Sequence, residues 1–152
     1  MEEHSDGVRQ SFEFLFYEII KYFANQTKQL SDGHTMAMHL IENMGCRIGQ
    51  RSIESPRFTS EIEIVKFICR GYWSHLFQKD INTLKTNNAD VYVLIDTDFP
   101  YLARIEPSQL YNPNILAFAC GLLRGGLSSL GVSCIVNAEI PRIPTCNFAV
   151  CC

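Results

Sequence analysis

A dense run of apolar side chains near the N-terminus constrains this 152-residue chain more than any other feature. Ten of the thirteen residues from Phe12 to Ala24 are apolar or aromatic. On a helical wheel at 100° per residue, seven of them fill an arc of about 160°. They are Tyr22, Leu15, Ile19, Phe12, Phe23, Phe16 and Ile20. So wide an arc predicts either a deeply buried core helix or a helix with one edge on its own core and another on a partner.

A second helix is predicted from 34 to about 54, between the turn residues Ser31–Gly33 and the helix breaker Pro56. Its apolar stripe comprises Ala37, Ile41, Met44 and Ile48, with Leu40 beside it. Gly45 and Gly49 share one face, where each glycine costs about 1 kcal/mol relative to alanine. These glycines indicate that another backbone or a ring approaches closely, unless the helix bends or ends near Gly45.

The rest of the chain predicts two more helices and four strands. The expected elements are a helix over 60–86 with a break near 71, strands 91–95 and 99–105 as a hairpin, a helix over 115–130 ended by Gly131, and strands 132–140 and 146–150. Because helices and strands do not alternate regularly, we expect an α+β domain with its helices on one face of a small, mainly antiparallel sheet.

Residues 1–10 are polar and have no apolar period, so we expect a flexible N-terminal extension followed by a single domain over 11–152. The 13 basic residues do not outnumber the 16 acidic ones, which gives a nucleic-acid role no electrostatic support. The longest nearly apolar run, 115–123, is too short to predict a membrane span. Nor does the N-terminus resemble a targeting segment.

No residue pattern nominates a catalytic or metal site. The seven cysteines include no CxxC pair, so we interpret them as reduced packing residues in a cytosolic protein. His34 and His39 are five residues apart and diverge on a helix. Gly121–Gly126 lacks the lysine of a phosphate loop; we expect it to pack a helix on the sheet, with Arg124 reaching solvent or a carboxylate. Asp96 and its neighbours read as a turn.

Four segments together resemble the small core subunits of the transport protein particle, TRAPP, and most of all the subunit-six type of its Bet-three-like family. They are IENMGCRIGQR at 41–51, IVKFICRGYW at 64–73, LAFACGLLRGGLSSL at 116–130 and VSCIVNAEIPRIPTCNF at 132–148. The resemblance covers roughly residues 12–150. It implies long helices packed on one face of a four-stranded antiparallel sheet.

The resemblance also implies a function. Such subunits are non-catalytic scaffold pieces of a tethering complex in ER-to-Golgi vesicle transport, and the whole complex promotes nucleotide release from a Rab GTPase. This chain would pair with a related small subunit, contact other TRAPP subunits, and lie peripherally at Golgi and ER–Golgi membranes; alone, it can form a homodimer. No cofactor or catalytic residue is implied.

The resemblance places the pairing surface on the first two helices. The residues expected there are Phe12, Leu15, Phe16, Ile19, Phe23, Leu40, Ile41, Met44 and Ile48. A sister subunit carries a palmitoyl chain on a cysteine after its second helix, but the linker between Glu54 and Phe58 here has no cysteine, so no acylation is expected. An alternative function is a lipid or small-hydrophobe binding module with an apolar interior pocket.

Overall fold

The computed structural model describes residues 2–53, 57–103 and 114–152, with the side chains of 13–53, 57–103 and 116–152. Its elements, in chain order, are α1 (Glu2–Thr27), α2 (Gly33–Arg51), α3 (Glu61–Phe67), the π-helical turn η1 (Ile68–Tyr72), α4 (Trp73–Phe77), β1 (Thr83–Thr86), β2 (Val91–Asp96), α5 (Pro100–Ala103), α6 (Asn114–Ser129), β3 (Ile135–Arg142) and β4 (Thr145–Cys151).

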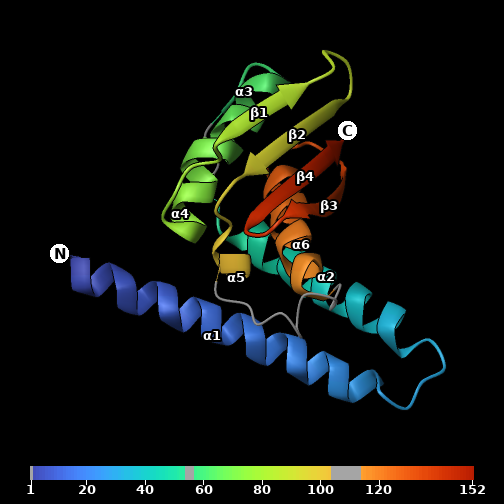
Figure 1. The fold of residues 1–152 in the computed structure, drawn as a ribbon. Coiled ribbons are helices and arrows are strands. Elements are labelled where there is room, and N and C mark those ends of the chain that lie inside the picture. The colour runs from blue at the N-terminus through green and yellow to red at the C-terminus, as the bar shows by residue number, and fades with distance from the viewer. Residues whose placement is uncertain (1, 54–56, 104–113) are drawn as a thin grey trace.

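The four strands form one antiparallel sheet in the order β1-β2-β4-β3. Side chains alternate between its faces, and Leu94, Phe148 and Val150 on the inner face are fully buried. Helices α3 and α6 lie behind the sheet in Figure 1, and α4 lies beside it. The predicted α+β class, with helices on one face of a four-stranded antiparallel sheet, is confirmed.

Helix α2 packs most extensively on α6, and α1 runs beside α2 at the outside of the molecule (Figure 1). Glycines let the α2 and α6 backbones touch. A Cβ added at Gly45 would lie 2.4 Å from the Phe118 carbonyl oxygen, and one at Gly125 would lie 2.0 Å from that of Cys46. The predicted close approach at Gly45 is therefore confirmed. The prediction that the 121–126 glycines pack a helix on the sheet is wrong, because Gly121 and Gly125 both face α2.

A buried carboxylate fixes the end of β2. Asp96 is fully buried, and it accepts hydrogen bonds from Trp73 Nε1 at 2.9 Å and from the Asp98 backbone N–H at 3.0 Å. Its other close partner is the Lys79 ammonium. The predicted turn after β2 is thus confirmed, and the same carboxylate ties it to α4.

Three predicted boundaries are wrong. Helix α1 begins at Glu2, so it includes most of the segment that was expected to be an extension. The flexibility of that segment stays a prediction. The helix predicted to reach 86 ends at Phe77, because Gln78 has a left-handed backbone with φ 59°. Residues 83–86 instead form β1. The predicted strand from 99 is helical over Pro100–Ala103, while residues 104–105 lie outside the described part of the chain.

Candidate partner interface on helices α1 and α2

Helix α1 buries one face against its own domain. The Phe16 ring is 1% exposed and stacks on Tyr101, with ring centroids 3.9 Å apart and planes 15° apart. It also lies 5.4 Å from the Phe118 ring of α6. Ile20, one turn along the same face, is 7% exposed. These contacts hold α1 on the domain and determine which side of the helix faces outward.

Beside this buried face lies an apolar strip that we name the α1 flank: Leu15, Ile19, Tyr22 and Phe23. Their spacing of four, seven and eight residues from the first member places them on one side of the helix. Leu15 is 49% exposed and Tyr22 is 59% exposed, while the other two are half-buried. Large apolar side chains clustered next to a packed face are typical of an interaction surface.

Helix α2 shows the same arrangement. Its inner residues Ala37 and Ile41 are 1% and 0% exposed, and they share a helix face with Gly45, which packs on α6. An adjoining strip, the α2 flank, comprises Met36, Leu40, Met44 and Ile48. Met36 is 46% exposed, and the others are half-buried. The flank thus repeats every four residues along most of the helix.

The residues predicted for the interface separate into two groups. Leu15, Ile19, Phe23, Leu40, Met44 and Ile48 lie on the two flanks. Phe16 and Ile41 instead lie in the chain's own core, where no partner can reach them without rearrangement of the domain. Phe12 belongs to α1, but its side chain is outside the described part. Tyr22 and Met36 were absent from the predicted set, although both extend its helical spacing.

A tight turn fixes how α1 and α2 meet. The Leu30 N–H donates to the Thr27 carbonyl at 3.0 Å, and the Gly33 N–H donates to that of Leu30 at 3.1 Å. A Cβ at Gly33 would lie 2.2 Å from the Thr27 oxygen, so a side chain there would force the helices apart. The predicted turn at Ser31–Gly33 is confirmed, but the Asp32 side chain makes no capping hydrogen bond.

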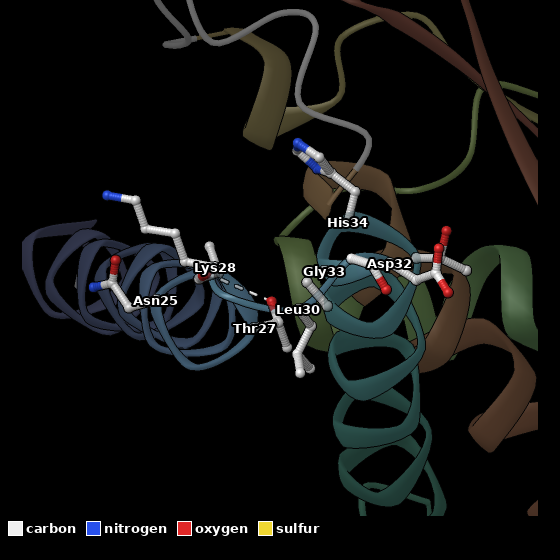
Figure 2. Close-up of a pocket in the computed structure, with 11 residues that line it drawn as sticks. Asn25, Thr27, Lys28, Leu30, Asp32, Gly33 and His34 are labelled. Atoms are coloured by element: carbon white, nitrogen blue, oxygen red, sulfur yellow. Dashed lines mark hydrogen bonds between the residues drawn. The ribbon is translucent and has the colours of Figure 1, made fainter.

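A recess of about 540 Å³ opens at this turn (Figure 2). It is lined by both helix ends, and its labelled side chains include the polar groups Asn25, Lys28, Asp32 and His34. This lining does not resemble the enclosed apolar interior that an acyl chain requires.

The buried thiols are poor nucleophiles. Burial raises the pKa of Cys69 to about 12 and that of Cys120 to about 12, whereas a reactive cysteine needs a lowered pKa. Within the described residues no group of three histidine, cysteine or acidic side chains could hold a metal ion. Across that same part of the chain, no helix is long and apolar enough to cross a membrane.

Comparisons with known proteins identify a family model and several relatives that match this chain. The family model described as "Transport protein particle (TRAPP) component" matches residues 12–151. Trafficking protein particle complex subunit 6b of Danio rerio is 41% identical over 148 residues, which cover 91% of this chain and 93% of that protein. Subunit 6A of Homo sapiens is 38% identical over 148 residues, with the same two coverages.

A solved structure supports the fold. The subunit 3 of a trafficking protein particle complex from Naegleria fowleri, covalently bound to palmitic acid, superposes with a TM-score of 0.67 and 16% identity. The match covers 93% of this chain and 94% of the other. With the family model spanning nearly the whole described fold, and with subunits 6A and 6b as relatives, this chain belongs to the TRAPP component family.

Proposed function

We propose that this chain is a non-catalytic assembly subunit of a trafficking protein particle complex and that it pairs with a related small subunit through the α1 and α2 flanks. The observation that carries the proposal is the exposure of Leu15 and Tyr22 beside a helix face that is already fully packed. The names of its relatives, which are subunits of such complexes, support the same role.

The two helices offer enough length for a stable interface. Helix α1 has 26 residues and α2 has 19, which correspond to about 39 Å and about 28 Å. A standard interface buries about 800 Å² on each partner. Burying one large apolar side chain contributes about 1.5–3 kcal/mol relative to leaving it in water. Several flank residues together can therefore outweigh the entropy lost on association.

The finer part of the proposal concerns the whole assembly. The complex would act on a Rab GTPase at Golgi or ER–Golgi membranes, and this subunit would hold its neighbours in place. The raised pKa values of Cys69 and Cys120 support a role without thiol chemistry. Membrane association would then come from the assembled complex.

Co-expression with a tagged small subunit of the same family tests the pairing. The wild-type chain should co-purify as a one-to-one pair. Leu15→Asp should abolish co-purification, because it buries an unpaired carboxylate in the interface. Phe14→Asp is the matched control: Phe14 is 67% exposed and lies on the side of α1 that carries Glu18 and Lys21, so this variant should still pair.

Circular dichroism must show that both variants are folded. Equal loss of pairing in the two variants, or none in either, would contradict the proposed surface. Reconstituting the whole complex with and without the Leu15→Asp chain then tests the finer claim. The expected result is a smaller assembly that exchanges Rab nucleotide more slowly, and full exchange activity without this subunit would contradict it.

A further inference from the structure

Three cysteines gather where β3 begins and β4 ends. Ile135 pairs with Cys151 at the last step of the β3–β4 ladder, so Cys134 and Cys152 face each other one step beyond it. The Cys152 N–H donates to the Asp90 carbonyl at 2.8 Å, which continues the pairing of β4 with β2 past Cys151. The backbone of Cys152 is therefore tied to the chain before β2, one residue beyond the end of β4.

Side-chain alternation places Cys134 and Cys152 on the same face of the sheet. The ladder pair Val136 and Val150 points inward and is buried, so the pair two residues further on points the same way. Cys151 alternates to the outer face with Ile135, which is 68% exposed. Cys134 is half-buried and Cys152 is exposed.

The spacing suits a covalent link. Residues directly opposite in an antiparallel pair have Cα atoms about 4.5–5.5 Å apart, and disulfides span Cα separations of about 4.4–6.8 Å. After burial, the neighbouring Cys152 is the next cause that raises the pKa of the Cys134 thiol, as expected of two thiols that lie side by side.

We propose that Cys134 and Cys152 are an oxidisable pair that forms an intramolecular cross-strand disulfide on reaction with a low-molecular-weight disulfide such as oxidised glutathione. The exposed Cys152, as its thiolate, attacks one glutathione sulfur; the glutathione S–S bond breaks, and one reduced glutathione leaves. Cys134, as its thiolate, then attacks the Cys152 sulfur and releases the second. The two cysteines are oxidised, one glutathione disulfide is reduced, and both thiol protons end on glutathione.

The surroundings make the reaction of this pair with such an oxidant slow at neutral pH, because they lower the thiolate fraction of both cysteines. Burial raises the pKa of Cys134 to about 12, although Arg124 of α6 acts to lower it. The pKa of Cys152 is raised first by burial and then by the Glu61 carboxylate at the start of α3. Neither thiol is therefore an activated nucleophile at neutral pH. The inference does not depend on which partner covers α1 and α2.

Peptide mapping of the folded full chain tests the proposal. The protein is treated with oxidised glutathione, its remaining thiols are alkylated, and it is digested with trypsin without reduction. Trypsin cuts after Arg124 and Arg142, so Cys134 leaves on a peptide with no other cysteine. Chymotrypsin then cuts after Phe148, which separates Cys146 from the last two cysteines. We expect the 125–142 peptide to be joined to the 149–152 peptide.

Three variants locate the bond. Cys134→Ser and Cys152→Ser should each abolish the linked peptide, while the neighbouring Cys151→Ser should retain it. Oxidised wild-type protein should run as a monomer on a non-reducing gel. A link through Cys151, a link found only in covalent dimers, or glutathione adducts on Cys152 with Cys134 still free would overturn the proposal.

Thermal unfolding gives a second readout. The bond closes a loop of 134–152, for which chain entropy predicts a rise in Tm of about 5–10 °C. The rise should disappear on reduction and be absent from Cys152→Ser, whose fold should otherwise be intact because that side chain is exposed. A linked protein whose Tm is no higher than that of the reduced protein would contradict the claim that the native strands already hold the two cysteines at the spacing of a disulfide.

Discussion

Replacing Gly125 by alanine places a methyl group against the backbone of helix α2. The added Cβ would lie 2.0 Å from the Cys46 carbonyl oxygen and 2.9 Å from its Cα, while ordinary van der Waals contact begins near 3.4 Å. Because all these neighbours are backbone atoms, α2 and α6 must separate or tilt. Overpacking of this kind costs about 1–3 kcal/mol, and the upper end applies here since no rotamer change relieves it.

The helix itself gains from the substitution, since alanine is favoured over glycine by about 1 kcal/mol. The net expectation is a loss of about 2 kcal/mol in the free energy of unfolding. For a chain of this length it corresponds to a fall in Tm of about 4–8 °C. Urea unfolding followed by circular dichroism measures the free energy, and differential scanning calorimetry measures the Tm.

Gly71→Ala is the matched control. It also replaces a helical glycine, but the three nearest atoms to its added Cβ all belong to the half-buried Phe67 ring, which can move aside. Its stability should stay within about 1 kcal/mol of wild type. If Gly125→Ala were no less stable than Gly71→Ala, the reasoning that α2 and α6 meet backbone to backbone would be refuted.

Three further predictions concern the domain core. Asp96→Asn should lower the free energy of unfolding by about 2–3 kcal/mol, since it removes the charge that pairs with Lys79, and equal urea midpoints for variant and wild type would count against it. Tyr72→Phe should cost about 1 kcal/mol, because the buried hydroxyl donates to a helix α6 carbonyl at 2.7 Å; the same urea titration checks it. Stability should fall from about pH 9 towards pH 12. Burial raises the pKa of Cys69 and of Cys120 from 9.0 to about 12 in the folded chain, so only the unfolded chain releases these protons in that range. Urea midpoints that stay constant as the pH rises would show this to be wrong.

Local sequence pattern predicted the elements whose signals are strong and short-range. Helix α6 ends as predicted, with Gly131 at φ 89° and the Val132 N–H donating back to the Leu127 carbonyl. The helix predicted from residue 60 begins at Glu61, where the Ser60 hydroxyl accepts from the Glu63 N–H at 3.4 Å. Each of these features is decided by residues within a few positions of one another.

The errors fall where partners distant in sequence decide the structure. Strand β1 has four residues with only Leu84 half-buried, so it carries no alternating pattern, and its pairing with β2 defines it. The run that begins at Phe99 was predicted as a strand, yet β2 already has β1 and β4 on its two edges. Phe99 and Tyr101 are instead both buried among aromatic rings.

The candidate interface was predictable as a helix pair but not residue by residue. A wheel places Phe16 and Leu15 within one wide apolar arc, and only the packing of Tyr101 against Phe16 shows which of them faces inward. One consequence is practical: Phe16→Asp should unfold the domain rather than test an interface, because the side chain is 1% exposed.

Hydroxyl-radical footprinting of the co-expressed pair tests the central claim most directly, because it reports side-chain exposure in the wild-type complex. Leu15, Tyr22 and Met36 are 46–59% exposed in the single chain, and Ile135 on the sheet is 68% exposed. With rates normalised to the same residues in the urea-unfolded chain, the account predicts strong protection of the three flank residues and none of Ile135. Flank residues oxidised as fast as Ile135 in the stable pair would contradict it.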